Sequence, residues 1–309
     1  MVFEVKILGC NSASFAYGRH HTAQIVNHDH RYFLVDCGEG TQIQMIKQKV
    51  KLARISHIFI SHLHGDHYLG LMGLLSTMHL QGRQSELHIY AFPGLDEILT
   101  LQMKVSAMVT AYTIHFHALE HTRSLIYEND HLCIETIPLD HSLPTNGFLF
   151  REKGGKRKVI SEKIVPGMQP RHIGMLKRGE DVVDESGNVL HSWKELTHPP
   201  AIARSYAFCS DTRYNESIIP QIEGVDLLYH ESTFLEEMES RAAQTFHSTA
   251  RHAALIALKA NVKQLMLGHF SSRYRETDVF LEEAKTVFVN TLLSREGHSF
   301  PVGIQPGED

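Results

Sequence analysis

Short apolar runs alternate with helical patterns along most of the chain. Phe3, Val5 and Ile7 alternate with charged residues, which is the period of a half-buried strand. Similar apolar runs predict further strands at 22–26, 32–36, 55–60, 86–92, 112–118, 132–138, 147–151, 205–209, 225–229 and 263–267. Helical spacing predicts helices over 41–49, 70–80, 94–107, 248–260 and 277–293. Because strands and helices interleave throughout, the sequence predicts a layered α/β (α+β) protein.

The pattern breaks between residues 151 and 200. This segment begins with the basic, glycine-containing run REKGGKRKV and is punctuated by Pro166, Gly167 and Pro170. A loop of this length without its own core is usually functional or disordered. Residues 151–178 hold nine basic and two acidic residues, a net charge of +7 that leaves −12 for the rest of the chain. A solvated basic loop is the simplest explanation, but this asymmetry favours a segment that binds phosphates.

Composition points to a globular protein with an unusual number of histidines. The 309 residues are 42% hydrophobic and 21% charged, with a net charge of −5 and 23 histidines. The four cysteines form no C-x-x-C pair, which fits a reducing compartment. The N-terminus does not read as a signal peptide, and no stretch approaches the ~20 apolar residues that span a bilayer. We therefore expect a cytoplasmic protein without a membrane partner.

Histidine and aspartate residues gather where predicted strands end. His62, His64, Asp66 and His67 directly follow the apolar run 55–60. Three later strands end in the same way, since they are followed by His141, Asp211 and His269. Imidazole and carboxylate are ordinary zinc ligands, and strand ends are where ligands collect in sheet proteins. Seven ligands exceed what one tetrahedral ion uses, so we expect a two-metal site bridged by Asp211. A chance cluster of surface histidines would not recur at four strand ends.

These residues match the H-x-H-x-D-H motif and the downstream ligands of the metallo-β-lactamase superfamily, which the chain resembles over nearly its whole length. The resemblance implies an αββα sandwich with two Zn²⁺ ions at one edge, although other divalent ions are also compatible with these ligands. One ion is then held by His62, His64, His141 and Asp211, and the other by Asp66, His67, Asp211 and His269.

Three further segments narrow the resemblance to one family. His230-Glu231-Ser232-Thr233, His247-Ser248-Thr249 and the stretch from Gly268 to Tyr274 are similar to motifs of the ribonuclease Z family, in its short form. Membership implies an endoribonuclease that removes the 3′ trailer from precursor transfer RNA and leaves a 3′-hydroxyl. It also implies a single domain over 1–309, with 151–200 inserted as a flexible RNA-binding arm, and a homodimer.

The resemblance also assigns catalytic roles. Asp66 orients the attacking water or accepts its proton, and His247 donates a proton to the leaving 3′ oxygen while Glu231 holds its tautomer. Without the resemblance, a histidine beside the capping residues Ser248 and Thr249 would more simply be an ordinary residue at a helix start.

Candidate RNA-binding residues lie in three segments. Arg273 and Tyr274 follow the last metal ligand, where a guanidinium could bind a phosphate and an aromatic ring could stack on a base. Arg19 is the residue of the family's first loop that this chain retains. The arm contributes Lys156, Arg157, Lys158, Arg171, Lys177 and Arg178.

Two other functions would also account for some of these residues. A binuclear hydrolase of a small thioester or phosphodiester would need the metals but no basic arm. An RNA-binding protein with structural zinc would need closed metal sites, whereas seven ligands around two ions leave room for a bridging water.

Overall fold

The computed structural model describes residues 2–155, 157–165, 167–200 and 202–303. These residues divide into two compact units. The larger unit holds the residues up to Ile126, Ile134–Phe150 and those from Ser205 onward, and the smaller unit holds Tyr127–Cys133 and Arg151–Arg204. None of the helices described is long and apolar enough to cross a membrane.

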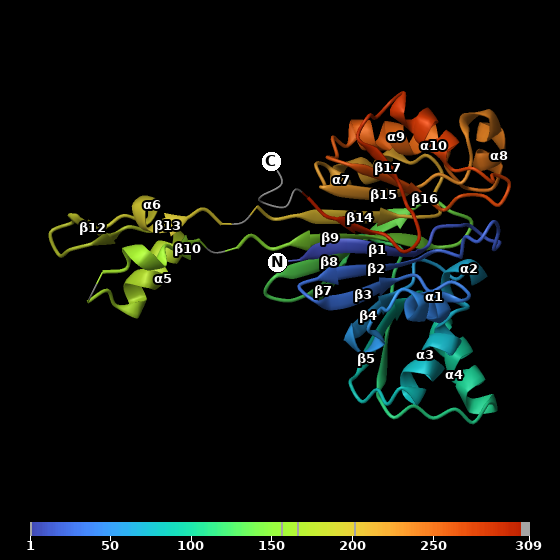
Figure 1. The fold of residues 1–309 in the computed structure, drawn as a ribbon, viewed down its shortest axis with the longest axis horizontal. Coiled ribbons are helices and arrows are strands. Elements are labelled where there is room, and N and C mark those ends of the chain that lie inside the picture. Colours follow the sequence, from blue (N-terminus) through green and yellow to red (C-terminus); the bar gives the residue numbers. More distant parts are fainter. Residues whose placement is uncertain (1, 156, 166, 201, 304–309) are drawn as a thin grey trace. The chain divides into compact units, whose positions relative to one another are not determined.

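The first of two seven-stranded sheets is built mainly from the N-terminal part of the chain (Figure 1). Its strands, in spatial order, are β18 (Ser299–Pro301), β1 (Phe3–Gly9), β2 (Ala23–His28), β3 (Arg31–Val35), β4 (Ile55–Phe59), β5 (Leu87–Ala91) and β6 (Ile114–Ala118). β1, β2, β3 and β18 pair antiparallel, and β3 to β6 run parallel. The parallel strands end at one edge of the sheet, and His62 follows the end of β4.

The second sheet is built mainly from the C-terminal part. Its order is β17 (Thr291–Leu293), β16 (Leu265–Gly268), β15 (Leu227–Glu231), β14 (Ser205–Cys209), β9 (Thr145–Glu152), β8 (Leu132–Leu139) and β7 (Leu125–Glu128). β14 to β17 run parallel. Their carboxyl ends therefore also meet at one edge, where Asp211, Glu231 and His269 lie.

The two sheets pack face to face through aromatic side chains. Phe33 on β3 lies 6.0 Å from Phe150 on β9, and Phe59 on β4 lies 5.4 Å from Phe148, measured between ring centroids. Offset and edge-on aromatic pairs of this kind stabilise a core beyond the area they bury.

Helices cover the outer face of each sheet (Figure 1). α1 (Thr41–Lys47), α3 (Leu71–Leu80) and α4 (Leu95–Val105) share a buried cluster with the first sheet, and α9 (Ala250–Lys259) and α10 (Asp278–Lys285) contact the second. Shorter helices and turns are η1 (Leu52–Arg54), α2 (Gly65–Tyr68), η3 (Glu216–Ile218), α7 (Ile219–Ile222), η4 (Glu236–Met238) and α8 (Glu239–Gln244). This is an αββα sandwich, so the predicted fold class is confirmed.

The smaller unit has secondary structure that the sequence analysis did not predict. It contains α5 (Pro170–Arg178), α6 (Trp193–Leu196) and η2 (Ser161–Lys163), with β10 (Lys158–Val159) paired to β13 (Thr197–His198) and β11 (Val182–Val183) paired to β12 (Val189–His191). Leu176 and Val182 are buried, and the Arg157 guanidinium lies 4.1 Å from the centroid of the Trp193 ring. Two apolar side chains and one cation–π pair give no periodic sequence signal.

One further expectation, a helix near the C-terminus, differs from the structure. The helix expected over 277–293 ends at Lys285, and Thr291–Leu293 forms the edge strand β17 instead. A short apolar run such as Thr-Leu-Leu fits both a helix and a strand, so periodicity alone cannot separate them. β7 was not predicted, because its four residues are too few to show alternation.

Candidate metal centre and cleft

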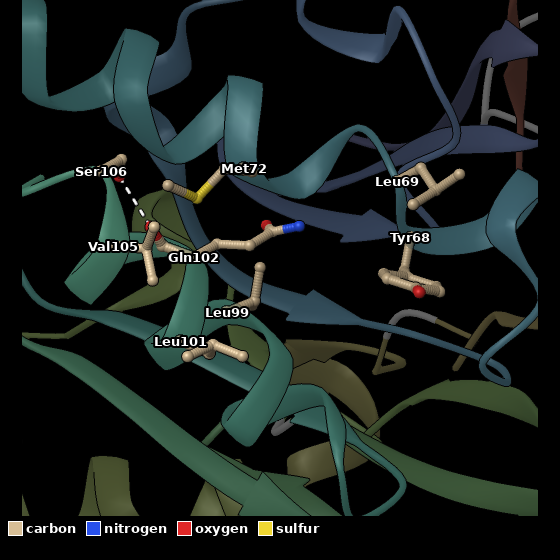
Figure 2. Close-up of a pocket in the computed structure, with 8 residues that line it drawn as sticks. All are labelled: Tyr68, Leu69, Met72, Leu99, Leu101, Gln102, Val105 and Ser106. Carbon is tan, nitrogen blue, oxygen red and sulfur yellow. Dashed lines mark hydrogen bonds between the residues drawn. The ribbon is translucent and has the colours of Figure 1, made fainter.

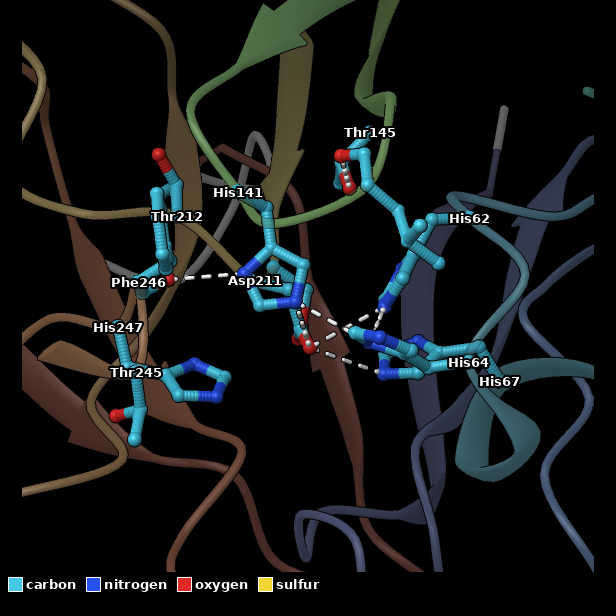
Figure 3. A network of polar contacts seen from close by, with 12 residues as sticks. His62, His64, His67, His141, Thr145, Asp211, Thr212, Thr245, Phe246 and His247 are labelled. Carbon is cyan, nitrogen blue, oxygen red and sulfur yellow. Dashed lines mark hydrogen bonds and ion pairs between the residues drawn. The ribbon is translucent and has the colours of Figure 1, made fainter.

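All seven predicted ligands meet at the edge where the parallel strands of both sheets end. Figure 3 shows five of them, His62, His64, His67, His141 and Asp211, directed toward one another. His62 follows β4, His64 precedes α2, and Asp66 and His67 lie within α2. The other three, His141, Asp211 and His269, follow β8, β14 and β16. The strand-end pattern therefore places side chains from distant parts of the sequence at one point.

Asp211 lies at the centre of this group. Its Oδ2 atom is 3.5 Å from His62 Nε2, 3.4 Å from His67 Nε2 and 3.8 Å from His141 Nε2. Its Oδ1 atom is 3.0 Å from His269 Nε2. The Asp211 carboxylate thus lies close to imidazoles of both expected ligand sets, as a carboxylate that bridges two ions would.

The remaining ligands complete two sets. His64 presents Nδ1, which is 2.9 Å from His62 Nε2 and 3.2 Å from His141 Nε2. Asp66 Oδ2 is 3.4 Å from His67 Nε2 and 3.7 Å from His269 Nε2. The donor atoms of His62, His64, His141 and Asp211 form one compact group, and those of Asp66, His67 and His269 form another.

The backbone is strained at three of these strand ends. Asp36, Asp211 and His269 have φ values of 56°, 57° and 59°. Residues other than glycine rarely adopt this left-handed region, and when they do they cluster at functional sites. These three positions directly follow or lie just beyond the ends of β3, β14 and β16.

Protein groups on the far side of the rings fix the imidazole tautomers. His67 Nδ1 donates to Asp36 at 2.7 Å, and His141 Nδ1 donates to the Phe246 carbonyl at 2.9 Å. His62 Nδ1 donates to Ser61 Oγ, which itself donates to Asp36. Each ring therefore keeps a proton on Nδ1 and directs the lone pair of Nε2 inward, which is how protein partners orient metal-bound histidines.

His269 is held by a longer chain of hydrogen bonds. Its Nδ1 donates to Thr233 Oγ1 at 2.9 Å, and that hydroxyl donates to Glu231. The sequence analysis missed Asp36, Ser61 and Thr233 in these supporting roles. For Asp36 the signal was present, because it also directly follows an apolar strand.

The inward-facing atoms fit bound cations. Among the described residues, the Nε2 atoms of His67 and His269 are buried without a hydrogen-bond partner, an arrangement that is costly unless a ligand satisfies them. Burial alone would raise the pKa of Asp211, but His269, His67 and His62 hold that pKa well below its ordinary value. A carboxylate whose oxygens lie 3.5 Å from His62 Nε2 and 3.0 Å from His269 Nε2 is part of a donor set suited to divalent metals.

His247 lies beside the ligands and pairs with a buried carboxylate. Its Nδ1 donates to Glu231 at 2.8 Å, and Glu231 also accepts from the backbone N–H groups of Thr212 and Ser248. Burial alone would lower the pKa of His247, but the Glu231 carboxylate raises it to about 9. The imidazole is therefore protonated at neutral pH, as a proton donor must be.

A cleft of about 610 Å³ opens over the ligands. His64, Asp66, His141, Asp211, His247 and His269 all contribute to its wall. Ser12, Ser14, Ser271 and Ser272 line it as well, which gives the cleft hydroxyl groups near the ligands. The site is therefore open, as catalytic metal sites are and structural ones are not.

Of the RNA-binding residues expected near the cleft, only Arg273 is exposed. Arg19 donates to the backbone carbonyls of Tyr274 and Arg275 and to Asn11, so its guanidinium joins two loops. Tyr274 is half-buried, and its ring packs edge-on against Phe280 at 4.9 Å. An RNA contact at these positions stays a prediction.

The basic residues of the smaller unit that were predicted to bind RNA differ in whether they have partners within the protein. Arg157 is stacked on Trp193 and donates to Thr197, and Arg178 forms a bidentate pair with Glu180. Lys158, Arg171 and Lys177 are exposed. Lys156 lies outside the described residues.

An apolar groove of about 490 Å³ lies between α3 and α4 (Figure 2). Leu69, Leu101 and Val105 line it and are 54%, 61% and 79% exposed. Such exposure of large aliphatic side chains commonly marks an interaction surface.

Comparison with known proteins identifies relatives along the whole chain. Ribonuclease Z of Bacteroides fragilis is 45% identical over 296 residues, which cover 95% of this chain and 97% of the relative. Ribonuclease Z of Cytophaga hutchinsonii is 48% identical over 303 residues, which cover 98% and 97%.

Solved structures share the fold. The short form of human tRNase Z (ELAC1) aligns with a TM-score of 0.70 and 23% identity over 97% of this chain and 100% of that chain. The metallo-β-lactamase fold protein YhfI from Bacillus subtilis aligns with a TM-score of 0.67 and 18% identity over 97% and 99%. The family model described as Anti-Pycsar protein Apyc1 matches residues 3–159. By these matches the chain belongs to the ribonuclease Z family and, through residues 3–159, to the Apyc1 family as well.

Proposed function

We propose that this protein is an endoribonuclease that removes the 3′ trailer from precursor transfer RNA. The reaction is hydrolysis of one phosphodiester, which leaves a 3′-hydroxyl on the transfer RNA and a 5′-phosphate on the trailer. The observation that supports the chemistry is the open cleft in which two groups of candidate metal ligands both lie close to Asp211, whose carboxylate oxygens are 3.5 Å from His62 Nε2 and 3.0 Å from His269 Nε2. The RNA substrate is supported by full-length similarity to proteins named Ribonuclease Z.

The ligands suit two zinc ions. His62, His64, His141 and Asp211 would hold one ion, and Asp66, His67, Asp211 and His269 would hold the other. Bound there, the ions would supply an activated water and offset negative charge on the phosphate. Nitrogen and carboxylate donors at these positions match the preferences of zinc.

Two side chains of the cleft then move the protons. Asp66 lines the same cleft as Asp211 and would orient the attacking water and accept its proton. The water oxygen bonds to phosphorus as the bond from phosphorus to the 3′ oxygen breaks. His247, protonated through its pairing with Glu231, donates its proton to that leaving oxygen, so no free alkoxide is released.

The smaller unit contributes affinity rather than chemistry. Its exposed Lys158, Arg171 and Lys177 would bind phosphates of the RNA, and such contacts position RNA without reading its sequence. Arg157 and Arg178 have partners within the protein, so we assign them a smaller share of this binding than their charge suggests.

We also propose a homodimer located in the cytoplasm. The apolar groove between α3 and α4 is the surface that a second copy would cover. All four cysteines are free thiols, which fits a reducing compartment. Light scattering should show a dimer, and the double variant Leu101→Asp and Val105→Asp should give the monomer mass. A dimer mass for that variant would rule out this surface.

One assay tests the proposed function directly. The purified protein, supplied with zinc, is incubated with a 3′-extended precursor transfer RNA and the cut is mapped. A product that ends at the discriminator nucleotide with a 3′-hydroxyl is expected. Hydrolysis of a small phosphodiester or thioester without cleavage of the precursor would identify a small-molecule hydrolase instead.

A further inference from the structure

Histidines that the cleft does not use form a second cluster, on the body of the first sheet. His57 on β4 pairs in register with His88 on β5, which pairs with His115 on β6. The rings of His57 and His88 stack with centroids 4.9 Å apart, and those of His88 and His115 stack at 4.8 Å. His117 lies two residues along β6 and therefore on the same face. Three in-register parallel strands thus build a ladder of imidazoles.

Glu86 adds a carboxylate to the β5–β6 end of this ladder. It precedes His88 by two residues, and its Oε2 lies 3.5 Å from His115 Nε2. Donor atoms of Glu86, His88 and His115 all lie within 4.8 Å of one another. Neighbouring donors around a tetrahedral zinc ion are about 3.3 Å apart at ordinary bond lengths. Small side-chain rotations would therefore bring these three residues onto one ion.

One donor atom of this group lacks any other partner. Although 40% of the His115 side chain is exposed, its Nε2 atom is buried and has no hydrogen bond within the described part of the chain. A buried polar atom without a partner is unfavourable. A cation reached from the solvent side would satisfy it.

His117 fixes the ring of His88. His88 Nδ1 and His117 Nε2 face each other at 3.0 Å. When Nδ1 of His88 donates to His117, the lone pair on His88 Nε2 becomes available to a metal.

We propose that Glu86, His88 and His115 form a second metal site that binds a transition-metal dication such as Zn²⁺, with His117 positioning His88. The site is separate from the cleft: the cleft ligands lie beyond the carboxyl ends of the strands, whereas Glu86 precedes β5 and His115 lies near the start of β6. Because β6 is the edge strand, an ion held here would tie that edge to the sheet.

Metal counting on the full-length protein tests this site. After equilibrium dialysis across a range of Zn²⁺ concentrations, the unchanged protein should bind one more ion per chain than His115→Phe. Phenylalanine keeps the ring stacking and removes the nitrogen donors. Amide exchange in residues 114–118 should slow as the additional ion binds, and should not change in the variant. Equal metal content in the two proteins would overturn the proposal.

Two further variants distinguish loss of this metal site from a folding defect and from non-specific binding. Glu86→Gln alters a side chain that is 66% exposed, and should weaken Zn²⁺ binding at this site at least tenfold; an unchanged affinity would also overturn the proposal. His298→Ala removes an exposed histidine from another part of the larger unit. It should bind as many ions as the unchanged protein, and an equal loss there would instead mean non-specific binding by surface histidines.

Discussion

The cleft and the smaller unit use charge in opposite ways. In the cleft, charged groups are buried and held by named partners: Asp211 is 2% exposed and Glu231 is fully buried with His247 against it. In the smaller unit, Lys158 and Lys177 are exposed. Buried, oriented charges suit chemistry at one atom, because little reorganisation is needed during reaction. Exposed cations suit adaptable, salt-sensitive binding to many phosphates. The difference predicts that mutations in the two regions fail in different ways.

The largest effect should come from the shared carboxylate. Asp211→Ala removes the one residue that both ligand sets use, and should lower kcat/KM by about 10³-fold or more, since metal-based stabilisation of charge is worth several kcal/mol. Zinc content should fall together with activity, whereas precursor affinity at fixed salt should stay near normal. Steady-state kinetics, metal analysis and a binding assay check this. An Asp211→Ala protein with full activity would exclude the bridged site.

Loss of the proposed proton donor should have the next largest effect. His247→Ala should lower the rate of the chemical step by about 10²-fold or more, the usual contribution of general acid catalysis. Single-turnover cleavage measures that step, and metal content should be unchanged. A variant that loses precursor binding but keeps its single-turnover rate would show that His247 contacts RNA rather than the leaving group.

Removing a supporting carboxylate should have an intermediate effect. Asp36→Asn weakens the hydrogen bond that orients His67, and should lower metal affinity by about 10–100-fold. Asp29→Asn is a matched control, because Asp29 is exposed in a turn and asparagine tolerates its positive φ. Competition with a chelator measures the affinity. Equal affinities in the two variants would show that Asp36 does not support the site.

The smallest effects should come from single cations of the smaller unit. Lys177→Ala should weaken precursor binding a few-fold without changing the chemical step. It should also make the salt dependence of log K shallower by about 0.7–0.9. Arg178→Ala is the matched comparison, because Arg178 is paired with Glu180 and should change the slope less. A salt dependence that is the same in both variants and in the unchanged protein would remove the phosphate-binding role.

The contrast between the cleft and the smaller unit also explains which parts of the structure were predictable from the sequence. The seven ligands could be identified because each follows an apolar run, and strand ends of parallel sheets converge. The hydrogen-bond partners of the rings could not be assigned, since Ser61 and Thr233 look like ordinary polar residues until the fold brings Ser61 to Asp36 and Thr233 to His269.

The smaller unit was predicted least well. Its order depends on Leu176, Val182 and the Arg157–Trp193 stack, which are too few and too scattered to give a period. Net charge alone also could not distinguish Arg157, which packs within the protein, from Lys177, which is exposed. Partners within the fold decide which cations remain available to RNA.

The division between chemistry and binding is tested most directly by deleting residues 152–198 and measuring two reactions in parallel. We expect cleavage of a 3′-extended precursor transfer RNA to be abolished, while a small model phosphodiester is still hydrolysed at the rate of the intact protein. Unimpaired cleavage of the precursor by the variant that lacks residues 152–198 would contradict a role of the smaller unit in binding the precursor.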